Sequence, residues 1–486
     1  MSAAESRIVT VFKLIIAFHL LGELKKEHPF VLKLRCQIKK NNIKELFMSI
    51  VNTLALESNK QIKINFNGGD LSSDAGLILI KEFAAKLGFI NLIRKYFKTT
   101  DTATMRRHTD DKNLMQMIYQ IIAAYFEDDC ADELKADPVF KALLNTDSLA
   151  SQPTLSRFFN RMDDSTLNQF DSIDAALRDI VYSISKPEFV LLDIDSTLFD
   201  TYGNQDGAAF NYHYQANGYH PLLCYDGLTG DLLKAELRDG TMYCGNKADE
   251  FIKPLLEEYL TRGIKTYMRG DSGFATPKLY EACESNGCSY CFRLKQNSAL
   301  IANAADKDTE LYDLAKHDAV SYAVTYGEFM YKANSWSYPR RVVYKIEKPY
   351  GQLTHMYTFI VTNMDAEPYK LIQFYCGRGR MENFIKESKS GFDFAAVSSH
   401  SKTVNANRMR LHMLAYNLFN WFRRLVLPAT LRKQRIDTIR LKLIKIAAKA
   451  VRSARYITFK LCSSCPYKKE FYRTLENIQQ LNVQLE

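Results

Sequence analysis

The chain has 486 residues, of which 47 % are hydrophobic and 25 % are charged, as is usual for a soluble globular protein. That length is enough for two or three domains with hydrophobic cores of their own. The net charge at pH 7 is +10, and residues 428–460 carry ten Lys or Arg against a single Asp, so nearly all of the excess positive charge lies in one block. A concentrated basic block favours a polyanionic partner.

The ten cysteines are scattered, which suits a reducing cytoplasm and excludes a disulfide framework. Two CxxC pairs, Cys288/Cys291 and Cys462/Cys465, lie far apart in the sequence. The first pair belongs to CSYCFRL, which is typical of a buried strand in which Cys acts as a small hydrophobe. We therefore do not expect a structural zinc site.

Residues 1–47 differ in character from the rest of the chain and are expected to be a dispensable leader. Their apolar run, Ile8–Leu24, is interrupted by Lys13 and His19 and is shorter than the roughly 20 residues of a membrane span. It also lacks the small-residue cleavage site of a signal peptide. We expect no membrane association, and we hypothesise that translation begins near Met48.

Residues 48–185 are expected to form an N-terminal domain, in which the periodicity from Ser73 to about Asn160 is mainly helical. Apolar residues recur at i, i+3 and i+4 through Gly76–Phe97 and Asn113–Phe126. The segment SQPTLSRF at 151–158 is typical of an N-cap followed by a helix with Pro153 near its first turn. These patterns predict a mainly helical N-terminal domain.

From residue 186 the pattern changes to strands. FVLLDID at 189–195 is a continuous apolar run that ends in carboxylates, as expected of a central strand whose end reaches a site. Three meandering strands followed by strands that alternate with helices predict a mixed α/β sheet. The further strands are expected at 210–215, 221–226, 232–238, 264–270 and 288–294, and the helices at 246–262 and 276–286.

Two of these strands run into aspartates. Asp193 and Asp195 are two residues apart and point to one face of the sheet, and Asp271 directly follows the strand at 264–270. Asp195 and Asp271 would meet at the carboxyl edge of the sheet, where two carboxylates cannot both stay ionised without cost unless a cation is present. Hard oxygen ligands favour Mg²⁺ or Mn²⁺. The alternative is that these aspartates are turn residues at strand ends.

Residues 300–366 interrupt the α/β pattern. They alternate and are rich in Tyr, Val and Thr, which predicts an antiparallel β insertion. A polar helix comes next, and then a long apolar-periodic helix at 405–426 that is expected to pack on the sheet. Residues 186–299 and 367–427 are therefore expected to form one domain around the insertion.

The polar helix carries a narrow stripe of functional side chains. In a regular helix Tyr375, Arg378, Glu382 and Lys389 fall within about 60° of arc. The simpler alternative is a solvated face on which Glu382 and Lys386 form an ordinary i,i+4 ion pair. Spacing alone does not decide between a solvated face and a site.

Residues 428–486 are expected to form a basic helical region. If 435–452 are helical, five cations share about 100° of arc and apolar side chains fill the adjacent face. Such a surface would track a nucleic-acid backbone, and the alternative is again a solvated face. The five cations are Arg435, Lys442, Lys445, Lys449 and Arg452.

Three motifs in this order resemble those of DDE transposases from bacterial insertion sequences. They are DIDST at 193–197, RGDSGF at 269–274 and the pattern Tyr-x2-Arg-x3-Glu-x6-Lys at 375–389. The chain most resembles the branch with the Tyr-Arg-Glu-Lys signature, and within it the thirteen-eighty group of insertion sequences. The resemblance covers roughly residues 60–460.

The resemblance implies a ribonuclease-H-like catalytic domain that is interrupted by a β insertion before its last acidic helix. Asp195, Asp271 and Glu382 would be the catalytic acids and would hold two Mg²⁺ or Mn²⁺ ions. Asp195 is preferred to Asp193 because Ser-Thr follows it. Water would cut the element's end, and the freed 3′-OH would attack target DNA without a covalent protein–DNA intermediate.

The resemblance also implies contacts with double-stranded DNA. Tyr375, Arg378 and Lys389 match positions that grip the DNA end, with Arg378 suited to a bidentate phosphate clamp. Trp336 is expected either to stack on a flipped base or to be a core residue.

The N-terminal domain would bind DNA. A homodimer would act on terminal inverted repeats and target DNA at the nucleoid of a bacterial cytoplasm.

Two other functions fit the same motifs. One is a ribonuclease-H-like nuclease that cuts without strand transfer. The other is a DNA-binding regulator that has lost catalysis. The presence of Asp195, Asp271 and Glu382 argues against the regulator, since a retired site does not need three carboxylates.

Overall fold

The computed structural model describes residues 53–100, 103, 105–315, 322–352 and 354–483. The expected leader 1–47 and the expected start near Met48 lie outside these residues. The chain divides into two compact units, Met1–Gly69 and Asp70–Glu486. In the described part of the first unit, β1 (Leu54–Ala55) pairs antiparallel with β2 (Lys63–Ile64).

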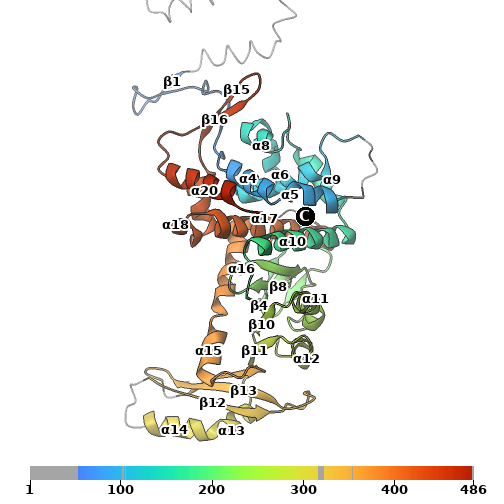
Figure 1. Ribbon diagram of the computed structural model, residues 1–486, viewed down its shortest axis with the longest axis vertical. Coiled ribbons are helices and arrows are strands. Elements are labelled where there is room, and N and C mark those ends of the chain that lie inside the picture. The colour runs from blue at the N-terminus through green and yellow to red at the C-terminus, as the bar shows by residue number, and fades with distance from the viewer. Residues whose placement is uncertain (1–52, 101–102, 104, 316–321, 353, 484–486) are drawn as a thin grey trace, which may run out of the picture. The chain divides into compact units, whose positions relative to one another are not determined.

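The second unit contains a mixed sheet, whose described strands have the order β12-β13-β14-β11-β10-β4-β8-β9 (Figure 1). The central strand, β4 (Phe189–Ser196), is parallel to β10 (Lys265–Gly270), which is parallel to β11 (Ser289–Leu294). On its other side β4 is antiparallel to β8 (Leu222–Asp226), and β8 is antiparallel to β9 (Leu232–Glu236). The predicted mixed α/β sheet is confirmed.

Alternation along β4 gives the sheet two different faces. Val190, Leu192 and Ile194 belong to a hydrophobic core that includes side chains of α11 (Ala248–Thr261) and α12 (Pro277–Ser285). Asp193 and Asp195 point to the opposite face. In Figure 1, α11 and α12 lie on one side of the sheet, and α15 and α16 lie on the other.

The predicted strand at 210–215 is wrong in its extent and its sheet. β6 (Ala209–Asn211) ends at Asn211, whose Oδ1 accepts hydrogen bonds from the backbone N–H groups of His213 and Tyr214 at 3.0 and 3.3 Å. An Asn side chain that bonds to its own backbone in this way favours a turn over a strand. Together with β7 (Ala216–Tyr219) and β5 (Phe199–Asp200), β6 forms a small antiparallel sheet.

Residues 300–366 contain the predicted antiparallel strands but begin with helices. α13 (Ser298–Asn303) and α14 (Ala305–Ala315) are rich in Ala, Leu and charged residues, which favour helix over strand. β14 also pairs antiparallel with β11, so the strands extend the central sheet. These strands are β12 (Ala323–Tyr331), β13 (Arg340–Lys348) and β14 (Met356–Thr362).

The N-terminal part of the second unit is helical, as predicted. The periodic segment 76–97 forms two helices because Gly88 adopts a left-handed φ of 65°, which breaks the helix. Ser151 precedes α9, and Pro153 lies in its first turn. The main helices are α4 (Leu77–Lys86), α5 (Phe89–Tyr96), α6 (Asp110–Ile122), α9 (Gln152–Asn160) and α10 (Asp164–Ile184).

The long helix α17 (Lys402–Val426) joins the helical layer to the sheet. It packs on α6 and α10 as well as on β9, so the expectation that this helix packs on the sheet is confirmed. Asn417, in the middle of the helix, donates hydrogen bonds to the Asp174 carboxylate of α10 at 2.8 Å and to the Leu232 carbonyl of β9 at 2.9 Å. The helices and this side of the sheet share one hydrophobic core.

The predicted basic helix over 435–452 is wrong. A short helix, α19 (Ile436–Ile439), continues into a π-helical turn at Arg440–Ile444, and 448–452 form strand β15. Tertiary pairing overrides the helical periodicity here, because β15 pairs with β3 (Leu71–Ser72) and Gly76 donates a hydrogen bond to the Ile444 carbonyl at 3.1 Å. The remaining C-terminal elements are α18 (Ala429–Arg432), β16 (Ile457–Leu461) and α20 (Lys468–Gln480).

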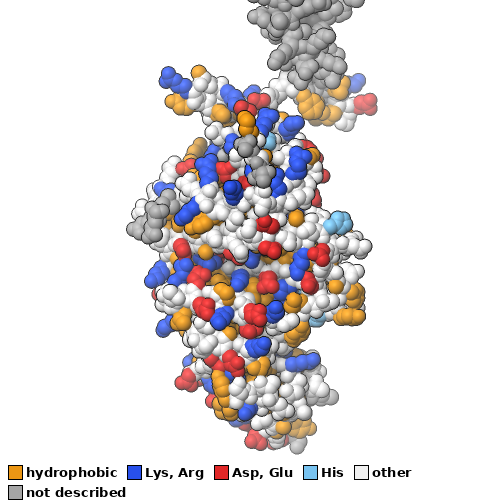
Figure 2. Space-filling model, turned by 90° about the vertical axis from the view of Figure 1, so that its right-hand side faces the viewer, with side chains coloured by type: hydrophobic (Ala, Val, Ile, Leu, Met, Phe, Trp, Pro, Cys, Tyr) orange, Lys and Arg blue, Asp and Glu red, His pale blue; other side chains and the backbone are white. Residues whose placement is uncertain are grey.

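The described surface carries mixed charge. Figure 2 shows Lys and Arg side chains interspersed with Asp and Glu over the middle of one face. Within the described ranges, no helix combines the length and the apolar character needed to cross a bilayer.

Candidate active site

Asp195, near the end of β4, forms an ion pair with Arg378, just before α16 (Gly379–Phe392). The Arg378 Nη2 lies 2.8 Å from Asp195 Oδ2, and the two side chains are only 12 % and 17 % exposed. The same nitrogen lies 3.4 Å from the Ile194 carbonyl oxygen. Burial would lower the pKa of the Arg378 guanidinium, but the carboxylates of Asp195 and Asp271 outweigh it and raise that pKa.

Asp193 and Asp195 share one face of β4 but have different environments. Asp193 is fully buried, and its two carboxylate oxygens accept hydrogen bonds from Arg269 Nε and Nη2, both at 2.7 Å. Asp195 retains solvent access beside a cleft. Asp193 is thus enclosed in a structural ion pair with Arg269 of β10, whereas Asp195 is accessible for chemistry.

Asp195 shares its electrostatic environment with two other carboxylates. Burial raises the pKa of Asp195 to about 6; Arg378 opposes this shift, whereas Asp271 and Glu382 add to it. Asp271 follows β10, and its Oδ1 accepts a hydrogen bond from the backbone of Gly273 at 2.8 Å. Glu382 is exposed in the first turn of α16. Two acids from distant parts of the chain therefore act on Asp195.

A cleft of about 510 Å³ opens beside Asp195 and Glu382. Glu382 and Lys386 both line it from α16, and among the described residues no ion pair joins them. An i,i+4 salt bridge between Glu382 and Lys386 therefore does not account for the polar face of α16. The lining residues are Asp195, Ser196, Thr197, Glu382, Ile385, Lys386, Lys389 and Ser390.

The stripe 375–389 is not one regular helix. Tyr375 belongs to α15 (Pro368–Cys376), and the chain passes into α16 through Gly377 and Arg378, where the Arg378 N–H donates to the Tyr375 carbonyl at 2.9 Å. Such an i→i+3 bond tightens the turn relative to an α-helix. The tighter turn changes the angular spacing between Tyr375 and the residues after it.

Lys389 and Tyr375 lie on either side of Arg378 along the chain. The Lys389 Nζ donates to the Leu198 carbonyl at 2.6 Å and lies 5.6 Å from the centre of the Phe199 ring. Burial lowers the pKa of Lys389. Burial raises the pKa of the Tyr375 hydroxyl, which Arg378 opposes. Both side chains therefore lie partly shielded from water near the site.

The carboxylate set has the chemistry of a divalent-cation site but not the closed geometry of one. Asp195, Asp271 and Glu382 offer hard oxygen ligands, and the pKa of Asp195 is raised mainly by burial, with smaller contributions from Asp271 and Glu382. In the part of the chain that the structure describes, however, no group of three His, Cys, Asp or Glu side chains is close enough to hold a metal ion. Arg378 occupies the cationic position beside Asp195.

Of the two roles expected for Trp336, its burial favours that of a core residue. Its side chain is 6 % exposed and packs edge-on against Tyr280 and Tyr331, with both pairs of ring centres 5.5 Å apart. The Arg340 guanidinium lies 5.7 Å from the centre of the Trp336 ring. A ring enclosed in this way cannot stack on a base without opening the sheet around it.

The five predicted cations of the basic region do not share one surface. Lys445 Nζ lies 2.6 Å from the buried Asp74 carboxylate and is thus a structural ion-pair partner. Lys442 donates to the Gln434 side chain at 3.0 Å. Lys449 and Arg452 are exposed on β15. The Arg435 Nη2 lies 3.5 Å from the hydroxyl of Ser390 at the cleft.

Two polar residues near the acids are not predicted by the sequence motifs. The Tyr214 hydroxyl donates to the Ser196 carbonyl at 3.3 Å. Burial raises the pKa of Tyr214 to about 12, and Asp195 and Asp271 add to the shift. Arg293, near the end of β11, is exposed and opposes the rise in the pKa of Tyr375 that burial causes. The only sequence signal for Tyr214 is its position in the aromatic run FNYHYQ. The alternation in that run predicts a strand and does not indicate a residue of the site.

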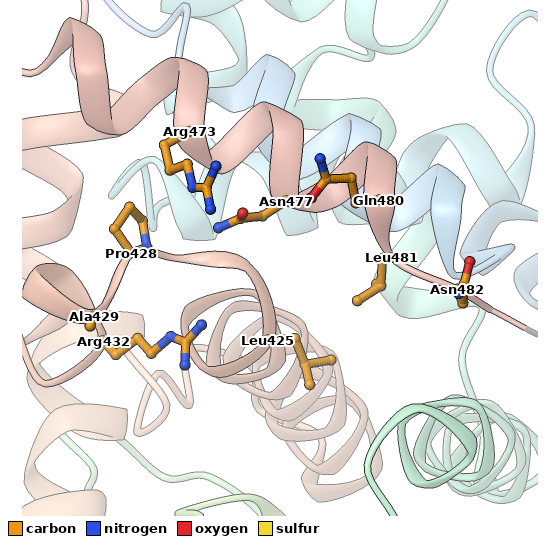
Figure 3. A pocket seen from close by; sticks show the side chains of 9 residues that line it. All are labelled: Leu425, Pro428, Ala429, Arg432, Arg473, Asn477, Gln480, Leu481 and Asn482. Carbon is orange, nitrogen blue, oxygen red and sulfur yellow. The ribbon is translucent and has the colours of Figure 1, made fainter.

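A second hollow, of about 450 Å³, lies between α17, α18 and α20. Figure 3 shows Arg473 and Arg432 on different elements around it. The Asn477 amide in its wall donates to the Val426 carbonyl at 2.7 Å. None of the described lining side chains is a carboxylate, so this hollow lacks the groups for metal-dependent chemistry.

Comparison with known proteins identifies the family. The family model of the transposase DDE domain group 1 matches residues 54–483. A similar solved structure is the piggyBac transposase in a synaptic complex with hairpin DNA, with 12 % sequence identity and a TM-score of 0.44, covering 76 % of this chain and 79 % of that chain. No curated protein matches the chain. Because the family model accounts for most of its length, the protein belongs to the transposase DDE domain group 1 family and is a transposase.

Proposed function

We propose that this transposase cleaves the ends of a bacterial insertion sequence of the Tyr-Arg-Glu-Lys branch and joins the freed 3′-OH ends to target DNA. The observation that carries the proposal is that Asp195 and Glu382 line one open cleft, while Asp271 and Glu382 both add to the rise in the pKa of Asp195. Carboxylates that face one another repel, which is unfavourable unless a cation is bound between them. A metal-dependent reaction at a phosphodiester would supply that cation.

The proposed catalytic core is ribonuclease-H-like and comprises residues 186–299 and 367–427. The strand order β9-β8-β4-β10-β11, antiparallel through the first three and parallel through the last three, supports it. Residues 300–366 would be an insertion before the acidic helix α16. We further propose that 48–185 form a DNA-binding domain and 428–486 a basic C-terminal region.

We propose that Asp195, Asp271 and Glu382 hold two Mg²⁺ or Mn²⁺ ions. DDE transposases use divalent metal ions, and carboxylate oxygens suit these two. Bound ions would act as Lewis acids toward the phosphodiester. For the acids to close around them, Arg378 must release Asp195, which frees the guanidinium for another anion.

Arg378, Lys389 and Tyr375 are proposed to hold the DNA end. A guanidinium that already prefers an oxyanion partner suits a phosphate, to which it can donate two parallel hydrogen bonds. Lys389 would act as a point charge in the wall of the cleft. Tyr375 would offer its ring and hydroxyl beside Arg378.

The proposed partners are the terminal inverted repeats of the element and the target DNA. Two ends must be joined in one reaction, so we propose a homodimer in the complex. The bacterial cytoplasm, at the nucleoid, is the proposed location.

A strand-transfer assay tests the function. Wild-type protein, DNA that carries the ends flanking the gene, a target plasmid and Mg²⁺ should give cleaved ends and joined products. Glu382→Gln and Asp195→Asn should abolish both. Cleavage without joining would favour a nuclease instead, whereas DNA binding without cleavage would favour a regulator. Joining that survives both substitutions would refute the assignment of the acids.

A further inference from the structure

A β-hairpin in the C-terminal region has an unusual surface. β15 pairs antiparallel with β16, and β15 pairs with β3 on its other side. Residues 438–469, which include the hairpin, contain no Asp or Glu. Four cations of the hairpin are exposed, and none forms an ion pair with a described residue. They are Lys449, Arg452, Arg455 and Lys460.

The register places two of these cations directly opposite each other. Lys449 is the cross-strand partner of Lys460. Like charges at directly opposed positions destabilise a sheet. Val451 and Thr458 come next on the same face and are exposed. The solvent face of the hairpin is therefore cationic at a cost in stability that its own residues do not offset.

The other face anchors the hairpin to the protein. Ala448 and Ala450 are buried, and Phe459 and Leu461 pack against the main hydrophobic core. The Cys462 N–H, directly after β16, donates to the Ala447 carbonyl at 2.8 Å. The ribbon is thus held on one side and presents the other to solvent.

The tip of the hairpin is ordered and presents an aromatic ring. The Ser453 N–H donates to the Tyr456 carbonyl at 2.9 Å, and the Tyr456 N–H donates to the Ser453 hydroxyl at 3.2 Å. Tyr456 is nevertheless 72 % exposed, and its neighbours in the chain are Arg455 and Ile457, which are also exposed. In Figure 1 the ribbon of β15 and β16 extends beyond α20.

We propose that this hairpin lies in the major groove of duplex DNA. Lys449 and Lys460 would contact phosphates, and Arg455 and Tyr456 at the tip would reach base edges. The proposal rests on the proposed function as a DNA-end transposase. The major groove, about 12 Å wide, admits a two-stranded β-ribbon and presents a distinct pattern of donors and acceptors for every base pair, whereas the pattern of the minor groove, about 6 Å wide, is degenerate. Phosphates would also neutralise the opposed lysine pair.

The first test measures binding without metal, so that no cleavage interferes. The double variant Lys449→Thr/Lys460→Thr replaces both cations with residues that favour strands. Affinity for a mixed-sequence duplex, measured by fluorescence anisotropy, should fall about 30-fold at 0.15 M salt, because two fewer counterions are released. The slope of log K against log salt should become shallower by about 1.8. Lys265→Thr, an exposed strand lysine on β10, is the matched control and should bind like wild type.

Thermal unfolding separates a binding role from a structural one. Removing the opposed charges should leave the melting temperature unchanged or raise it. A large loss of stability in the double variant, in parallel with the loss of affinity, would overturn the proposal. So would unchanged affinity and an unchanged salt slope.

Chemical footprinting tests the groove. Dimethyl sulfate methylates guanine N7, which lies in the major groove. Wild-type protein should protect guanines that Tyr456→Ala leaves reactive, whereas protection that is the same in both would overturn the major-groove assignment. If the double variant lost as much affinity for anionic vesicles or for duplex RNA as for duplex DNA, the hairpin would be a general polyanion surface. That result would likewise overturn the major-groove assignment.

The two proposals can fail separately. At saturating DNA and with Mg²⁺, the hairpin variant should retain cleavage that depends on Glu382. If the hairpin variant binds DNA as tightly as wild type does, and cleavage still depends on Glu382, only the hairpin proposal fails. If cleavage does not depend on Glu382 but the salt slope changes as expected, only the proposed catalytic site fails.

Discussion

Arg378 and Asp195, which are 183 positions apart in the sequence, form an ion pair of 2.8 Å, and Asp195 also lines the cleft. One partner carries the cation proposed for the DNA end, and the other carries the first acid proposed for metal. In the absence of both ligands, each side chain neutralises the other. Binding of a divalent cation and of a phosphate then become linked, since each ligand releases the partner that the other needs.

Replacing Arg378 by Gln should therefore change two affinities in opposite directions. Mg²⁺ or Mn²⁺ should bind more tightly, by about ten-fold, because the cation that competes for Asp195 is removed. Affinity for a DNA end should fall. Calorimetric titration with Mn²⁺ and anisotropy with end-containing DNA measure the two effects. Weaker metal binding in Arg378→Gln would contradict the linkage.

Asp193 and Asp195 should respond differently to the same substitution. Asp193→Asn leaves Arg269 buried and without its charged partner, so the free energy of unfolding should fall by about 3 to 5 kcal/mol. Asp195→Asn keeps an acceptor for Arg378 and relieves repulsion from Asp271 and Glu382, so stability should change by less than about 1 kcal/mol.

Urea unfolding and cleavage assays, run in parallel, distinguish the two aspartates. We expect Asp195→Asn to be folded and inactive. An active, stable Asp193→Asn together with a stable, active Asp195→Asn would show that neither is catalytic. An inactive but fully stable Asp193→Asn would instead transfer the catalytic role to that residue.

The central strands could be predicted from the sequence because each burial pattern is local. The apolar run of β4 and the segments at 221–226, 264–270 and 288–294 identify themselves by composition and length, and their order indicates a mixed sheet. The same patterns identify Asp195 near the end of β4 and Asp271 directly after β10. Glu382 is identified from the spacing of the motif at 375–389.

Features that depend on distant partners could not be predicted in this way. The helical periodicity of 435–452 gives way to a strand because Ala448 pairs with Ser72, far earlier in the chain. Trp336 is buried because Tyr280 and Arg340 enclose it, and its own sequence neighbourhood does not indicate this. Local periodicity is a weak prior where tertiary pairing competes with it.

His412 should make stability depend on pH. It is buried in α17, its Nδ1 lies 2.6 Å from the carbonyl of Phe392 at the end of α16, and burial lowers its pKa to about 4. Below about pH 6.5 the unfolded chain binds a proton that the folded chain does not. This contribution to stability is therefore complete above that pH and is lost as the pH falls toward 4, by about 3 kcal/mol.

His412→Asn tests this contribution, since the Asn amide can still donate to the Phe392 carbonyl. The free energy of unfolding of the variant should fall less steeply between pH 6.5 and 4 than that of wild type. Burial raises the pKa of Asp174 and of Asp226 to about 6, which acts in the opposite direction in both proteins and cancels in the comparison. Parallel curves for wild type and variant would refute the role of His412.

Gly76 should tolerate no side chain, because the N-terminal helices and the C-terminal segment meet there backbone to backbone. A Cβ at this position would lie 1.6 Å from the Leu443 carbonyl oxygen, which cannot move without breaking the hydrogen bond from Gly76 to Ile444. Gly76→Ala should therefore destabilise the fold by about 3 kcal/mol or more. Gly203→Ala, where the nearest atom is 3.8 Å away, is the control and should be nearly neutral. Thermal unfolding measures both, and similar melting temperatures for the two variants would show that the C-terminal segment is not fixed against α4.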